Sequence, residues 1–215
     1  TNIRQNLHMC SGVLTSNFSY DGNPITVSTR VHPTLDMVMV DIFSPRLKGL
    51  GVRVRYPTVN PAINPDPTSF DTAGKQSVTV LSQTPGRVTL RRTIDETAYY
   101  SAITSDGAIT RAGDADFRTF GAGDSLKVMV GFDRSEAPAA APAYADGVRA
   151  VAAHWQDFWK SGGAVDFTGS TDPRANELER RVVLSQYLSA IDGAGKLPPQ
   201  EEGVFSNSWY GKFHL

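Results

Sequence analysis

The feature that most constrains the fold is a series of short segments with the two-residue alternation of β-strands, which fills the chain up to about residue 133. The expected strands are Ser11–Tyr20, Ile25–Val31, Leu35–Phe43, Gly51–Tyr56, Ser77–Leu81, Arg87–Ile94, Thr97–Thr104, Ala108–Arg111, Asp116–Phe120 and Ser125–Phe132. Turn sequences such as Asp21-Gly22 and Pro85-Gly86 separate them, and no helical pattern intervenes. This pattern predicts an antiparallel β-sandwich and not a series of β-α-β units.

Two of these segments allow finer expectations. Leu35–Phe43 is mostly apolar on both faces, which indicates a strand in the interior between layers. Gly51–Tyr56 alternates valine with arginine, so one of its sides should face water. Pro57–Gly74 contains four prolines and is expected to be an irregular loop. Cys10 lies in a strand-like segment and is expected to be a buried, inert thiol.

The composition changes after residue 134. Ser135–Ala145 is rich in proline and alanine, as in a semi-rigid linker, and Tyr144–Lys160 carries apolar residues at helical spacing. Trp155 and Trp159 lie one turn apart on this helix and are interpreted as the residues that dock it. A second helix should follow, with Asp172 as its N-cap, Pro173 at its first position and Gly193 after its end. The expected domains are therefore 1–134, 135–171 and 172–215.

Composition and charge exclude several classes of protein. The chain has 40% hydrophobic and 20% charged residues, as in an ordinary globular protein. A net charge of −1 without a basic block argues against a nucleic-acid partner, and no apolar run is long enough for a membrane span. No metal-ligand spacing occurs, and no cofactor is expected. A single cysteine leaves the compartment open; a secreted or periplasmic location is a working assumption only.

The last nineteen residues, Leu197–Leu215, combine aromatic rings with many hydrogen-bonding groups. Rings that stack on C–H faces, beside polar groups that fix hydroxyls, suit a polyol ligand. The candidate sugar-binding residues are Gln200, Glu201, Trp209, Tyr210, Lys212 and His214. For Trp209, sugar stacking and a structural plug both remain open. Glu201 and Glu202 are adjacent carboxylates, and one of them could either act as an acid with a raised pKa or cap a helix.

The segment Ala175–Leu215 (ANELERRVVLSQYLSAIDGAGKLPPQEEGVFSNSWYGKFHL) resembles the start of the catalytic domain of six-hairpin glycosidases, particularly proteins related to glycoside hydrolase family 65. Gly12–Pro33 is similar to strands of their N-terminal domain. The resemblance implies an antiparallel β-supersandwich, then a linker helix, then the beginning of an (α/α)6 toroid. It also implies that Tyr210, Lys212 and His214 belong to a loop that enters the mouth of the toroid and contacts sugar.

In such enzymes an acid and a base perform inverting cleavage and lie later in the toroid, past residue 215. The resemblance thus implies that the chain is the N-terminal portion of a longer glycoside hydrolase or phosphorylase. Its expected partners are an oligosaccharide or glycoside and the remainder of the catalytic domain, or a second chain that completes it. Two alternatives stay open: a non-catalytic carbohydrate-binding sandwich, and a structural sandwich that docks another chain through Trp209.

Overall fold

The computed structural model describes residues 1–47, 49–59, 68–70, 76–135 and 140–195. The chain forms two compact units, Thr1–Trp155 and a second that begins at Gln156. The first contains all described strands and most of the first helix, and the second contains the end of that helix and another helix. The expected order, antiparallel sheets and then helices, is confirmed.

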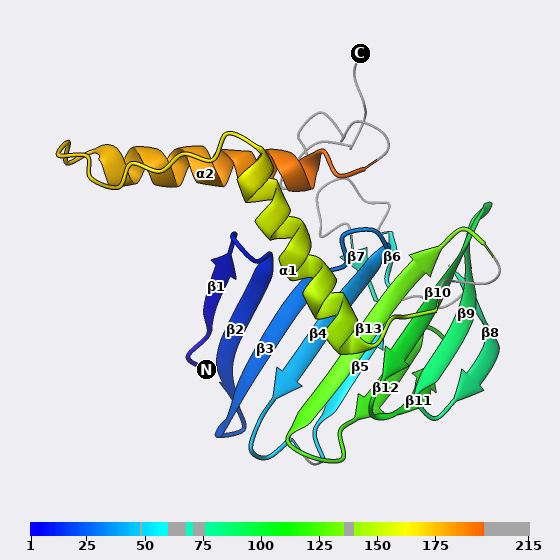
Figure 1. The fold of residues 1–215 in the computed structure, drawn as a ribbon. Coiled ribbons are helices and arrows are strands. Elements are labelled where there is room, and N and C mark those ends of the chain that lie inside the picture. The colour runs from blue at the N-terminus through cyan, green and yellow to red at the C-terminus, as the bar shows by residue number, and fades with distance from the viewer. Residues whose placement is uncertain (48, 60–67, 71–75, 136–139, 196–215) are drawn as a thin grey trace. The chain divides into compact units, whose positions relative to one another are not determined.

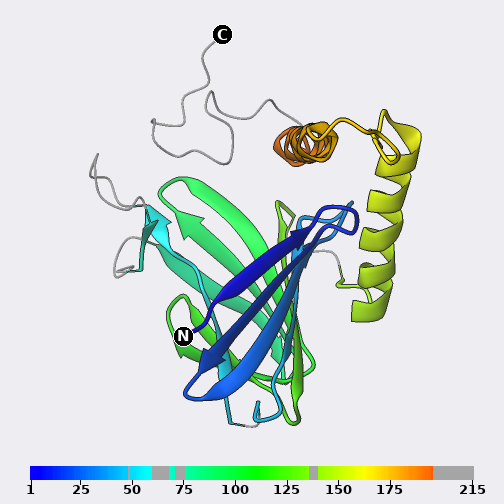
Figure 2. The same cartoon turned by 90° about the vertical axis from the view of Figure 1, so that its left-hand side faces the viewer.

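The largest element of the first unit is an eight-stranded antiparallel sheet (Figure 1). Its strands, in spatial order, are β1 (Arg4–His8), β2 (Val13–Tyr20), β3 (Asn23–Val31), β4 (Met37–Phe43), β13 (Ser125–Asp133), β10 (Thr97–Ser105), β9 (Arg87–Ile94) and β8 (Ser77–Thr84). A three-stranded antiparallel sheet of β11 (Ala108–Gly113), β12 (Asp116–Phe120) and β5 (Gly51–Arg55) packs against it (Figure 2). The two-residue turn Asp21-Gly22 has positive φ at both positions, as a tight hairpin requires.

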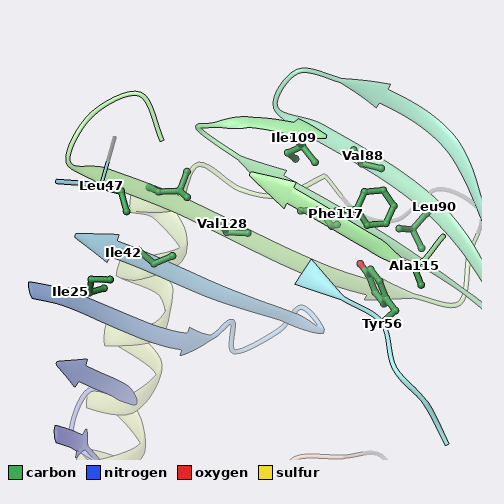
Figure 3. Close-up of a cluster of buried hydrophobic side chains, with 12 residues drawn as sticks. Ile25, Ile42, Leu47, Tyr56, Val88, Leu90, Ile109, Ala115, Phe117 and Val128 are labelled. Atoms are coloured by element: carbon green, nitrogen blue, oxygen red, sulfur yellow. The ribbon is translucent and has the colours of Figure 1, made fainter. Parts of the chain in front are cut away.

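The apolar core lies between these two sheets, as Figure 3 shows. Phe117 of β12 is fully buried there, and Tyr56 meets its ring edge-on at 6.3 Å between centroids. Val88 and Leu90 of β9 reach the same core from the opposite sheet. Val52 and Val54 also pack inward while their neighbouring arginines are exposed, which confirms the alternation expected for Gly51–Tyr56.

Strand β4 is covered on both faces, as its sequence predicted. Ile42 faces the core between the sheets, whereas Met37 and Met39 face a second apolar cluster with Met129 of β13. The helix α1 (Tyr144–Ser161) covers this second cluster with Tyr144 and Val148. A Cβ at Gly147 would lie 2.5 Å from the Met39 methyl carbon, so glycine lets α1 approach the sheet closely (Figure 1).

Two sequence-based expectations for the first unit were wrong. Cys10 lies in the turn between β1 and β2, where the Ser11 N–H donates to the His8 carbonyl at 3.1 Å, and the thiol is exposed. The expected loop 57–74 contains a short ladder, β6 (Thr58–Val59) with β7 (Thr68–Ser69). Strands of two residues are too short to produce a periodic signal in the sequence.

The second unit contains the helix α2 (Ala175–Asp192). Asp172 is not its N-cap: a separate turn comes first, in which the Asp172 carboxylate accepts from the Arg174 N–H at 2.9 Å. Arg174 occupies the cap position and makes no side-chain capping bond, so Pro173 precedes the helix. The helix ends at Gly193 as expected, with the glycine N–H bonded to the Ser189 carbonyl at 3.0 Å.

Candidate functional site

The six candidate sugar-binding residues, Gln200, Glu201, Trp209, Tyr210, Lys212 and His214, lie outside the described residues. Their proposed contact with sugar therefore stays a prediction. The structure describes the helix that precedes them in the chain, α2, and the segment that leads into it.

Glu177 anchors the first turn of α2. Its carboxylate accepts from Arg180 at 2.8 Å and from Arg181 at 2.7 Å, three and four residues further along the helix. Hydrogen bonds from Arg180 and then Arg181 lower the pKa of Glu177 to about 2. The glutamate is therefore an ionised, structural group at the start of the helix, where a negative charge also interacts favourably with the helix dipole.

The segment before α2 is tied to the helix at two points. A Glu179 carboxylate oxygen accepts from the Phe167 N–H at 2.7 Å, and the Gln186 amide donates to the Gly163 carbonyl, also at 2.7 Å. These bonds satisfy backbone groups that a segment without regular secondary structure would otherwise leave to water. The segment and α2 thus form one local structure in the second unit.

A shallow hollow of about 700 Å³ opens along this structure, with mainly apolar walls. It is lined by Phe158, Gly162, Gly163, Arg181, Val182, Ser185, Gln186, Ser189 and Ala190. The Gln186 Oε1 atom is buried and has no partner among the described residues. An unpaired buried acceptor costs free energy, so a hydroxyl or amide donor from a neighbouring segment or a ligand would be stabilised there.

The first unit has a smaller hollow, of about 200 Å³, on the exposed face of the three-stranded sheet. Arg53 of β5 and Asp116 of β12 meet at its wall in a two-pronged ion pair, with the Arg53 Nε atom 2.9 and 2.8 Å from the two carboxylate oxygens. Arg55 lies beside them with its guanidinium carbon 4.0 Å from the centre of the Phe70 ring. Hydrogen bonding from Arg53 lowers the pKa of Asp116.

This ion pair predicts a pH dependence of stability. Because the pKa of Asp116 is lower in the folded protein than its ordinary value of 3.8, the pair stabilises the fold above pH 3.8 and is lost as the pH falls through the folded-state pKa. Asp116→Asn should therefore be less stable than wild type at pH 7, and the difference should narrow towards pH 2. Urea unfolding at a series of pH values measures it.

The matched control is the same substitution in an Arg53→Gln background, where no pair remains to be lost. Asp116→Asn should then change the free energy of unfolding less than in the wild-type background, because only the weaker charge interactions of Asp116 with Arg55 and Arg118 remain. If the difference in the free energy of unfolding between wild type and Asp116→Asn stayed constant down to pH 2, the ion pair would not be the source of the pH dependence.

No group of three or more histidine, cysteine, aspartate or glutamate residues in the described part of the chain could hold a metal ion. Nor is either described helix long and apolar enough to cross a membrane.

No protein-family model matches the chain, and no curated protein matches it. Among solved structures it is similar to a chain described as "Putative kojibiose phosphorylase from human microbiome", with a TM-score of 0.48 and 10% sequence identity. The similarity covers 86% of this chain and 27% of that chain. This chain therefore spans about a quarter of that protein's length.

The sequence did not reveal the hollow of the first unit. The alternation in Gly51–Arg55 correctly placed Arg53 and Arg55 on an exposed face. Their neighbours Phe70 and Asp116 come from distant parts of the chain, and the pairing of β5 with β12 brings Asp116 to Arg53 and Arg55. No local pattern encodes that pairing; the one available signal was the acidic residue that begins the strand Asp116–Phe120.

Proposed function

We propose that the chain is the N-terminal portion of a carbohydrate-active enzyme of the six-hairpin glycosidase type, which cleaves α-linked glycosidic bonds in oligosaccharides or glycoconjugates. The observation that carries the proposal is the order of elements: a sandwich, then α1, then α2, which leads directly into the aromatic segment. This order is the one implied by the resemblance of Ala175–Leu215 to family 65 proteins. The domains are proposed as 1–134, 135–171 and 172–215, with α2 as the first helix of a toroid.

The apolar stripe of α2, which consists of Leu178, Val182, Leu188 and Ile191 at helical spacing, supports the assignment of this helix to a larger helical domain. Tyr187 is its one buried residue among those described, and Leu178 is 51% exposed. A helix in a complete domain buries such a stripe against its neighbours. We propose that further helices of the protein, or of a second chain, cover this stripe and supply the two catalytic carboxylates for inversion.

In this proposal Trp209 stacks on a sugar ring, Tyr210, Lys212 and His214 bind its hydroxyls, and Gln200 and Glu201 shape the wall. The protein that contains this chain and the toroid should release sugar from α-glycosides. Trp209→Ala should lower that turnover at least about tenfold, because aromatic stacking and exclusion of water are both lost. The measurement is the rate of sugar release with and without inorganic phosphate, which also separates hydrolysis from phosphorolysis.

Tyr20→Ala is the matched control, since it truncates another aromatic residue, 60% exposed at the end of β2. It should leave the rate unchanged. Wild-type turnover in Trp209→Ala, with a normal unfolding midpoint, would remove Trp209 from the site.

A second candidate function is carbohydrate binding without catalysis. It is favoured by the compactness of the first unit, whose sheets enclose a core of their own. Calorimetry of residues 1–155 against a panel of neutral oligosaccharides separates the two: binding by this fragment alone favours the binding module, and its absence favours the enzyme.

A further inference from the structure

The small hollow on the three-stranded sheet contains one arginine, Arg55, that forms no ion pair with any described residue. The hollow is lined by Arg53, Arg55, Tyr56, Phe70, Gly113, Asp114, Ala115 and Asp116. Arg53 and Asp116 neutralise each other through their ion pair. Asp114 is 96% exposed at the rim, and its nearest described cation is Arg111, at 3.8 Å. Of the four charged residues in the lining, Arg55 is thus the one that forms no ion pair among the described residues.

The Arg55 guanidinium makes a single described contact, with the face of the Phe70 ring. This stacking uses the flat side of the guanidinium and leaves its N–H groups, which point outward in the plane, able to donate. No carboxylate among the described residues forms an ion pair with it, and the Asp116 carboxylate, opposite Arg55 in the register of β12 and β5, interacts with its charge without forming one. Arg118, which lies directly across from Arg53 in the register of β12 and β5, adds a second positive charge to this face of the sheet. The local potential therefore favours an anion.

The geometry points to a binding site for a small carboxylate-bearing ligand, which we propose is held by Arg55 and Phe70. A carboxylate matches the planar fork of an arginine in two parallel hydrogen bonds. Drug-sized ligands need roughly 300–1,000 Å³, and this hollow has about 200 Å³. It therefore suits one small acid, such as a single sugar acid. Phe70 is 48% exposed, which leaves part of its ring available to the C–H groups of such a ligand.

The site is independent of the proposed catalytic function, because all of its lining residues belong to the first unit. If the carboxylate site were disproved, the proposed role of Trp209 in sugar binding would be unaffected. If the role of Trp209 were disproved, the carboxylate site would be unaffected. Binding and turnover therefore report on the two proposals separately.

Calorimetric titration of the full chain with glucuronate, glucose and acetate tests the site. Glucuronate should bind and glucose, which lacks the carboxylate, should bind at least about tenfold more weakly. Acetate shows how much the carboxylate contributes by itself. If acetate binds as tightly as glucuronate, the site recognises the carboxylate alone. If acetate binds more weakly, the sugar ring of glucuronate also contributes to binding. Both results support the carboxylate site, whereas equal affinity for glucuronate and glucose would overturn it.

Two variants assign the binding to Arg55. Arg55→Gln should lower the affinity for glucuronate at least about tenfold, since it removes a charge-assisted pair of hydrogen bonds. Arg118→Gln is the matched control, because it removes an equal charge from the same sheet face at a residue that does not line the hollow. An equal loss in both variants would mean that only diffuse charge attracts the ligand, and no loss in Arg55→Gln would place the ligand elsewhere. Either result contradicts the proposal.

Discussion

Gly12→Ala is expected to destabilise the first unit by roughly 4 kcal/mol, through backbone strain together with a steric clash. Gly12 has a φ of +61°, which residues with a Cβ rarely adopt. A Cβ built there would lie 1.9 Å from the Trp155 Nε1 atom, well inside contact distance. Trp155 is 8% exposed, and a large buried ring of α1 cannot turn aside without giving up its own packing.

Urea unfolding at equilibrium measures this loss, and Gly22→Ala provides its control. Gly22 has a similar φ of +73° in a hairpin turn, but nothing lies within 4 Å of the position that a Cβ would take there. It should therefore show the backbone strain alone, roughly 1 kcal/mol. Equal losses in the two variants would show that the turn moves away from Trp155 at little cost.

Arg92→Met is expected to cost roughly 3 kcal/mol, because it leaves three half-buried acceptors without this donor. Arg92 of β9 is 5% exposed. Its guanidinium donates to the Gln76 side-chain oxygen, the Tyr99 hydroxyl and the Pro57 carbonyl. It also lies 5.7 Å from the centre of the Tyr56 ring and 5.6 Å from that of Tyr99. Methionine preserves much of the volume and none of these bonds.

Arg91→Met is the matched control, since Arg91 is the exposed neighbour on the opposite face of β9. A substitution at such a surface position usually changes stability by less than about 0.5 kcal/mol. The free energy of unfolding of both variants is measured in urea. Equal values for Arg92→Met and Arg91→Met would mean that water replaces the hydrogen bonds of Arg92, and that these bonds do not stabilise the core.

The sequence by itself determined most of the strands and both helices, but it missed β1 (Arg4–His8) and the two-residue strands β6 and β7. The expected strands Arg87–Ile94 and Asp116–Phe120 agree with the structure residue for residue, and α1 begins at Tyr144 as predicted. The sequence also predicted correctly that β4 is buried on both faces, because both of its faces are apolar. These features follow from hydrophobic periodicity and turn residues, which act over a few neighbouring positions. For the candidate sugar-binding segment the sequence supplied residue types, and their arrangement stays a prediction.

Only the tertiary structure decided how distant residues meet. It placed Asp116 against Arg53, 63 positions away, and brought Gly12 beneath Trp155. It buried Arg92 among neutral acceptors and left Cys10 exposed in a turn, against the sequence-based expectation. The physical reason is that strand order and register depend on the sum of packing over the whole core. The local alternation of apolar and polar residues predicts whether a side chain faces the core or the solvent. Which residues it contacts there depends on how the sheets assemble.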